Sequence, residues 1–307
     1  MSSMSILLAM QSALAQGVLW GILALGVYIT YRILDIADLT VDGSFATGGA
    51  VCAVCVLNGV DPILSLLLAT IAGALAGFIT GFLHTRCEIP AILAGILTQI
   101  GLYSINLRIM GRANTPLLKA NTLFKNISQA TGLSSAWTSL IIGILVSVVI
   151  VLILYWYFGT EIGSSIRATG NNEQMVRALG VNTNHMKILG LMIGNALIAL
   201  SGALVTQSQG YADIKMGIGA IVIGLASIVI GEVIFGHKGN FAYRLTSIII
   251  GSIIYRMIVA IVLQMGMNTD DLKLLTAVLV AIALSVPVFL AKKNQRAMYK
   301  KLTQKED

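Results

Sequence analysis

Four ionisable side chains stand out because they lie in or beside long apolar runs. Asp38 and Asp42 fall in ILDIADLTVDG, whereas Glu232 ends AIVIGLASIVIGE and Arg256 lies within LTSIIIGSIIYRMIVAIVLQ. A charge at membrane depth is costly, and it commonly serves a solute path or a partner charge. A solute that carries both a carboxylate and an ammonium group would need one side chain of each sign on its path, and Arg256 could face the carboxylate and Asp38 the ammonium. We therefore treat all four residues as candidates for a translocation path.

Each candidate also has a purely structural interpretation. Asp38 and Asp42 could cap the helix that follows them, and Glu232 could lie at the membrane interface. Arg256 is about 18 Å along its helix from Arg244 at about 1.5 Å per residue, so snorkelling to the surface accounts for it less well. An internal ion pair between Arg256 and Glu232 is a further alternative, although their expected depths differ by several residues.

Motifs for catalysis or metal binding are absent from the sequence. Cys52 and Cys55 form a C-x-x-C, but they lie in the apolar run 46–57, whereas redox and zinc motifs need polar surroundings. The sequence contains no phosphate-binding G-x-x-x-x-G-K-[ST] and no H-E-x-x-H. Three histidines are scattered through connecting segments: His84, His185 and His237. We expect no enzyme activity, no cofactor and no metal in this chain.

The composition is that of a polytopic membrane protein. Hydrophobic residues make up 57% of 307, charged residues only 11%, and the mean hydropathy is +0.88. The net charge is +7, but six of the twenty cations lie in the tail 292–305. Such a tail is typical of the cytoplasmic leaflet and argues against nucleic-acid binding. No cleavable signal peptide is expected in residues 1–30, because they lack a basic start.

Runs of roughly twenty apolar residues predict an all-α protein with about nine transmembrane spans. The short second run suggests half of a broken helix. Nine passes with the basic tail inside put the N-terminus outside, although the connection 108–125 then carries four cations on the outer side. The predicted spans are Ile6–Tyr31, Ser44–Leu57, Pro62–Leu83, Pro90–Met110, Ala136–Phe158, Ile188–Gln207, Gly217–Phe235, Leu245–Gln264 and Leu272–Leu290.

A short internal repeat accompanies two of these spans. The tripeptide 37–39 (ADL) precedes a run rich in small residues, and 212–214 (ADI) precedes another. In the predicted topology the two lie on opposite sides of the membrane, as an inverted repeat requires, and inverted repeats place solute sites at their interface. Chance similarity is the alternative.

A polar segment of 29 residues, 159–187, separates two uncharged apolar runs. Within it Asn171 or Asn172 could cap a short helix with one apolar edge, which Gly180 would end. Such a helix has little to pack on in its own chain, so we expect it to bind a cytoplasmic partner. The expected contact residues are Asn172, Glu173, Met175, Val176, Arg177, Leu179 and Gly180.

Three long segments carry a family resemblance: YRILDIADLTVDGSFATGGAV, GSSIRATGNNEQMVRALGVNTNHMKILG and NALIALSGALVTQSQGYADIKMGIGAIVIGLASIVIGEVIF. They resemble the permease subunit of bacterial ABC importers, in the branched-chain-amino-acid/ribose permease superfamily. Within it, the branch described as tryptophan/tyrosine transport permeases is the most similar. The likeness runs from about Trp20 to Leu290.

The resemblance implies a transmembrane permease domain, 1–290, with a coupling loop at 159–187 and a basic cytoplasmic tail at 291–307. It implies a coupling helix near 171–180 that docks on a separate ABC ATPase, where ATP is bound. A second permease copy and an extracytoplasmic lipoprotein would complete the complex in the bacterial cytoplasmic membrane. The implied solute is an aromatic or other apolar amino acid.

Two alternatives to this function stay open. The importer could carry a different solute, such as a branched-chain amino acid, a nucleoside or a sugar. The chain could instead be a secondary transporter driven by an ion through Asp38, Asp42 and Glu232.

Overall fold

The computed structural model describes residues 3–118, 120–236, 239–265, 271, 274–278, 280–282 and 285. The chain is helical nearly throughout this part, as the composition predicted. Its helices are α1 (Ser3–Tyr28), which continues into the π-helical turn η1 (Ile29–Ile33), α2 (Val41–Leu57), α3 (Pro62–Thr85), α4 (Ala91–Met110), α5 (Leu123–Thr131), α6 (Ser135–Gly159), α7 (Glu161–Asn171), α8 (Glu173–Ala178), α9 (Thr183–Gln209), α10 (Ala220–Phe235) and α11 (Phe241–Gln264). Strands β1 (Asn114–Pro116) and β2 (Tyr211–Asp213) form an antiparallel pair, with Asn114 opposite Asp213.

Within the described residues, six helices are long and apolar enough to cross a membrane: α1 with η1, α3, α4, α6, α9 and α11. Helices α2 and α10 are also apolar but have only 17 and 16 residues. At about 1.5 Å per residue each is roughly 25 Å long, which is less than the hydrocarbon core of about 30 Å. The predicted count of nine spans is therefore not confirmed, and the ninth, Leu272–Leu290, lies largely outside the described residues.

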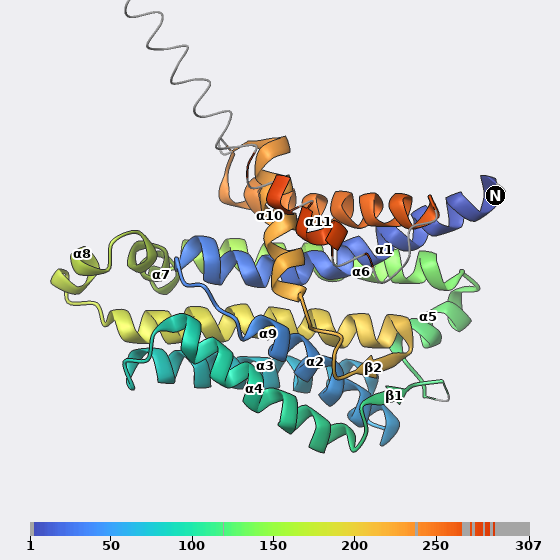
Figure 1. Ribbon diagram of the computed structural model, residues 1–307, viewed down its shortest axis with the longest axis horizontal. Helices are drawn as coiled ribbons and strands as arrows, with labels where there is room; N and C mark the ends of the chain where they lie inside the picture. Colours follow the sequence, from blue (N-terminus) through green and yellow to red (C-terminus); the bar gives the residue numbers. More distant parts are fainter. Residues whose placement is uncertain are drawn as a thin grey trace, which may run out of the picture.

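The long helices run side by side, and the connecting structure gathers at two opposite ends of the bundle (Figure 1). Helices α7 and α8 lie at one end, which we call the α8 end. Helix α5, both strands and the N-terminus lie at the other, which we call the β end. The segment 159–187 and the connection 108–125 are thus separated as the sequence predicted, while the assignment of one end to the cytoplasm stays a prediction.

Helix α9 lies at the centre and packs against α1, α2 and α3. Small residues allow the backbones to approach closely: Gly48 of α2 meets the Ala199 carbonyl of α9, and Gly202 of α9 meets the Phe45 carbonyl of α2. In lipid the hydrophobic effect does not drive helices together, so association depends on such close packing and on hydrogen bonds between helices. The fold is therefore organised around one buried helix whose neighbours approach it through glycines.

The contact at Gly48 predicts a large effect of one added side chain. A Cβ there would overlap the Ala199 carbonyl, whereas a Cβ at Gly101 of α4 meets nothing within 4 Å. We expect Gly48→Val to destabilise the protein by about 1–3 kcal/mol, the usual range for overpacking. Gly101→Val is the matched control and should unfold like the parent in detergent. Equal thermal midpoints for the two variants would contradict the packing of α2 on α9.

Candidate functional site

The chain between η1 and α2 is irregular and lies inside the protein. Here the Asp38 carboxylate, only 2% exposed, accepts two hydrogen bonds. Its Oδ1 accepts from the Thr40 backbone N–H at 2.9 Å, and its Oδ2 accepts from Asn195 Nδ2 at 2.6 Å. At membrane depth no water satisfies a broken helix, so side chains must do so. Asp38 therefore stabilises the interruption from within.

Further polar groups extend from this pair and connect three helices. Ser44 Oγ of α2 donates to Asn195 Oδ1 of α9 at 2.6 Å, and the Thr40 and Thr80 hydroxyls lie 2.6 Å apart. All these side chains are buried. We call Asp38, Thr40, Ser44, Thr80 and Asn195 the polar network. Its hydrogen bonds explain why Asp38 points into the protein. The sequence suggested that Asp38 faces the ammonium of a solute, and this arrangement does not show such a role.

Asp42 joins the two short helices to each other. It lies in the first turn of α2, but its carboxylate accepts from the N–H groups of Gly219 and Ile221 at 2.9 and 3.0 Å. These groups begin α10, where the unpaired N–H dipoles give partial positive charge. The interpretation that Asp42 caps its own helix is thus wrong, because it caps a helix 177 residues further along. Thr40 takes the N-cap position of α2.

A cavity of about 410 Å³ opens beside this junction, between α2, α4 and the segment that leads into α10. Its lining includes Asp42, Gln99, Tyr103, Ser104 and Asn106. The Asn106 Oδ1 is buried and has no hydrogen-bond partner in the described part of the chain. We call this space the α2–α4 cavity. Its volume and mixed lining are those of a site for a small polar molecule with an apolar part.

Sequence reasoning missed the contribution of α4 to this cavity. Gln99, Tyr103 and Asn106 are spaced by four and three residues, which puts them on one face of a helix. This polar stripe within the apolar run 90–110 was a usable signal. Charged residues alone do not reveal it, because Gln99, Tyr103 and Asn106 are all neutral.

Glu232 lies away from this cavity, at the last turn of α10. Its carboxylate is bound by Arg32 of η1 through two hydrogen bonds, of 2.9 Å from Nε and 2.6 Å from Nη2. The Arg32 side chain is 45% exposed and that of Glu232 17%. A bidentate pair of this kind holds the end of α10 against η1, which agrees best with the interfacial interpretation of Glu232.

Arg256 lies with aromatic rings. Its guanidinium carbon is 4.1 Å from the centroid of Trp20, and the Trp20 and Phe45 ring centroids are 4.7 Å apart with the ring planes tilted by 36°. The alternative of an ion pair with Glu232 is wrong, since Glu232 binds Arg32 instead. The Arg256 Nε is buried with no hydrogen-bond partner among the described residues. A cation stacked on a ring is stabilised without a carboxylate, and the four candidate residues do not form one site.

Helix α8 lies at the α8 end as a short, well-capped element (Figure 1). The Asn172 side chain accepts from the Met175 N–H at 3.0 Å, which confirms the predicted cap. Gly180 ends the element with φ +83°, a conformation that favours glycine. Val176 is 2% exposed, whereas Met175 and Leu179 are 50% and 74% exposed. Val176 therefore packs inward, and the apolar surface open to a partner consists of Met175 and Leu179.

Glu173 fixes α8 to the start of α9. Its carboxylate binds Lys187 at 2.7 Å and Arg177 at 2.7 Å, and accepts from the Thr183 hydroxyl at 3.0 Å. The pKa of the Glu173 carboxyl is lowered, mainly by the hydrogen bond from Lys187. The hydrogen bond from Thr183 and the positive charges of Lys187 and Arg177 lower it further. The group therefore stays ionised at neutral pH, and α8 is held in one position. Glu173 and Arg177, which the sequence placed at a partner contact, are used within the chain.

Long apolar helices, two short helices that meet inside the bundle, and a cavity of mixed lining at their junction define a polytopic membrane protein with a solute-sized site. The chain belongs to the family "Branched-chain amino acid transport system / permease component", whose model matches residues 9–285. The family resemblance that the sequence suggested is thereby confirmed, and the chain is a membrane permease component.

Similar proteins are known over nearly the whole chain. A tyrosine transport system permease protein of Clostridioides difficile is 39% identical over 96% of this chain and 94% of its own length. An uncharacterized protein of Rickettsia prowazekii is 38% identical over 89% of this chain and 96% of its own. Among solved structures, an inward-facing metal-chelate type ABC transporter covers 92% of this chain and 84% of its own, with 14% identity and a TM-score of 0.48.

The polar network predicts that Asn195 matters far more for stability than a second buried asparagine. Asn195→Leu leaves the buried Asp38 carboxylate without its side-chain donor, which should cost about 1.5–3 kcal/mol, the range for a hydrogen bond to a charged group. Asn106→Leu is the matched control, because the Asn106 Oδ1 has no partner to lose. Thermal unfolding in detergent measures the loss of stability of each purified variant. The network has no such role if the two variants unfold at the same temperature.

Proposed function

We propose that this chain is the permease subunit of an ABC importer that moves an aromatic amino acid, with tyrosine as the first candidate, into the cytoplasm. The observation that carries the proposal is the α2–α4 cavity, which adjoins the point where Asp42 joins α2 to α10. Discontinuous helices that meet inside the membrane are typical of solute sites in transporters. The name of the C. difficile relative supports tyrosine.

The lining of the cavity suits such a solute. Tyr103, Ile214 and Ile218 offer an aromatic and two aliphatic side chains for a ring. Asp42 retains lone pairs beyond the two that cap α10, and Asn106 has a buried oxygen without a partner. Both are acceptors, which a substrate ammonium requires. A phenolic amino acid would thus find an acceptor for its ammonium and apolar surface for its ring.

The cavity opens on the outer face of α4, where Tyr103 and Ser104 are exposed. Polar side chains that face lipid are unfavourable, whereas those that face a shared path are usual. A second permease copy placed against α4 would enclose the cavity. This supports the homodimer that the resemblance implies.

Energy would come from a separate ABC ATPase bound at the α8 end. Met175 and Leu179 present apolar surface on an element that Asn172 and Glu173 hold in place. A rigid element transmits a domain movement better than a loose loop does. The α8 end and the tail 291–307 would then be cytoplasmic. The β end, with the N-terminus, would face the extracytoplasmic lipoprotein that delivers the solute.

An ion-driven secondary transporter is less well supported. Asp38 is hydrogen-bonded to Asn195, and Asp42 accepts from the first N–H groups of α10. Glu232 forms an ion pair with Arg32. Among the described residues no group of three His, Cys, Asp or Glu side chains could hold a metal ion. A branched-chain amino acid, a nucleoside or a sugar remains an alternative solute, and the second experiment below distinguishes these from tyrosine.

Leu179→Asp tests the coupling surface. A carboxylate placed in an apolar docking groove is buried unpaired, so binding of the ATPase should weaken by more than about tenfold. Co-purification of the ATPase and its stimulated hydrolysis measure the loss. Leu118→Asp makes the same change at another exposed leucine, in the 108–125 connection away from α8, and should leave both readouts unchanged. If the ATPase binds both variants equally, α8 is not the docking element.

Ser104→Trp tests the cavity as the solute site. The indole would occupy the space between α2 and α4, so uptake of labelled tyrosine into proteoliposomes containing the complete importer should fall by about tenfold or more. ATPase binding should be retained. Ile105→Trp is the control, since Ile105 is exposed on the same helix outside the cavity. Unlabelled tyrosine should compete better than leucine, a nucleoside or ribose; the opposite order would overturn tyrosine as the solute.

A further inference from the structure

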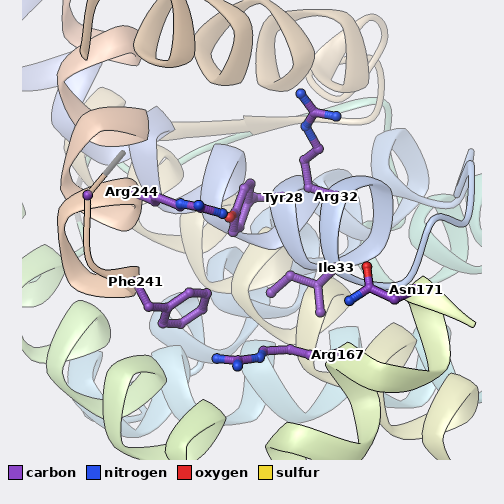
Figure 2. Close-up of a pocket in the computed structure, with 8 residues that line it drawn as sticks. Tyr28, Arg32, Ile33, Arg167, Asn171, Phe241 and Arg244 are labelled. Carbon is purple, nitrogen blue, oxygen red and sulfur yellow. The ribbon is translucent and has the colours of Figure 1, made fainter. Parts of the chain in front are cut away.

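A second polar cavity lies at the α8 end, where no part of the proposed transport site is found. It measures about 360 Å³ and is lined by Tyr28, Arg32, Arg167, Asn171 and Arg244, among others. Figure 2 shows Arg244 of α11 pointing toward Tyr28 of α1 and Arg167 of α7 pointing toward Phe241, whereas the Arg32 side chain extends away from them. We call it the arginine cavity. Three arginines that line one cavity need either anionic partners within the chain or an anionic ligand.

Partners within the chain account for only part of this charge. Glu232 binds Arg32, and the Tyr28 phenol interacts with Arg244. No carboxylate in the described part of the chain lies within 4 Å of Arg167, whose guanidinium carbon is 5.7 Å from the Phe241 ring. Arg167 therefore brings to the cavity a positive charge that no carboxylate among the described residues pairs.

The start of α11 adds to this positive potential. Gly239 and Phe241 line the cavity, and Asn240 caps α11 without a side-chain hydrogen bond. The first-turn N–H groups of a long helix carry partial positive charge and favour anions. This feature is independent of the arginines and points to the same kind of ligand.

An apolar groove approaches the arginine cavity from the membrane side. It has a volume of about 470 Å³ and lies between α6 and α11, with Val18 of α1 as part of its floor. Val148 and Leu152 of α6 face Ile249 and Ile253 of α11 across it. We call it the α6–α11 groove. Its lining is almost wholly aliphatic, as an acyl chain requires.

A third depression adjoins the arginine cavity and follows the groove along α6. It is lined by Tyr155, Trp156, Arg167 and Phe241, so it shares Arg167 and Phe241 with the arginine cavity. Along α6, Tyr155 follows Leu152 of the groove by less than one turn. Tyrosine and tryptophan are typical of the headgroup level of a bilayer. The aliphatic groove, the aromatic residues and the basic cavity thus follow one another in the same order as the acyl chain, the glycerol and the headgroup of a phospholipid.

We infer that these three parts form one binding site for an anionic phospholipid. Arg167 and Arg244 bind the phosphate, the aromatic residues lie at the glycerol level, and one acyl chain fills the α6–α11 groove. Basic pockets between membrane helices are known to bind anionic headgroups. A lipid here would connect α6, α7 and α11, and α7 leads directly into α8. A free phosphate would satisfy the arginines but would leave the groove without an occupant.

The test uses the full-length permease purified in detergent and native mass spectrometry of retained lipid. Phosphatidylglycerol should be retained about tenfold better than phosphatidylcholine with the same acyl chains, because both carry the phosphate but the choline cation of the latter is repelled by the arginines that line the cavity. Arg167→Gln should abolish the difference. Arg86→Gln removes an exposed arginine outside the three lining sets and should preserve it. If Arg167→Gln does not fold, Arg167→Lys, which lacks the planar fork, should give a smaller loss in the same direction.

A second pair of variants separates a lipid from a free phosphate. Val148→Trp fills the groove and should reduce retention of phosphatidylglycerol about tenfold, whereas Leu145→Trp, on the same helix outside the groove, should not. Inorganic phosphate should fail to displace the lipid. Equal retention of the two lipids, or equal behaviour of Arg167→Gln and Arg86→Gln, overturns the site. Displacement by phosphate together with no effect of Val148→Trp identifies a free-phosphate site instead.

Discussion

The hydrogen bond between Asn195 and Asp38 is the interaction on which the interior depends. The chain leaves helical geometry between η1 and α2 while still inside the bundle, where no water can satisfy its polar groups. Asp38 binds the Thr40 N–H, and Asn195 binds both Asp38 and Ser44. Because Asn195 lies on the central helix α9, this bond fixes where α2 begins. The close approach of Gly48 to Ala199 then follows from that position.

The start of α10 depends in turn on α2. Asp42 lies in the first turn of α2 and caps the N–H groups of Gly219 and Ile221, so displacing α2 would leave the positive end of α10 uncompensated. The α2–α4 cavity lies beside this contact. A shift in the angle between α2 and α10 would change its shape directly, and this offers a physical route from domain movement to release of a solute.

The α8 end combines a helix held rigid by ion pairs with a cavity lined by arginines. Helix α8 must be rigid, and Glu173 achieves this with Lys187, Arg177 and Thr183. The arginine cavity collects positive charge next to α7, where an anionic lipid would brace the support of α8. Coupling to a soluble partner and anchoring in the bilayer would then depend on adjacent parts of one segment, 159–187.

The sequence by itself determined the long apolar helices and the short helix α8, but not α5, α7 or the two strands. Every predicted apolar run up to Gln264 coincides with a helix, and Asn172 caps α8 as expected, because apolar length and capping are local properties. The partners of the charged residues were decided only by tertiary structure. Asp42 caps α10, Glu232 binds Arg32, and Arg256 stacks on Trp20. Each contact joins residues far apart in the chain, and periodicity carries no information about which helices become neighbours.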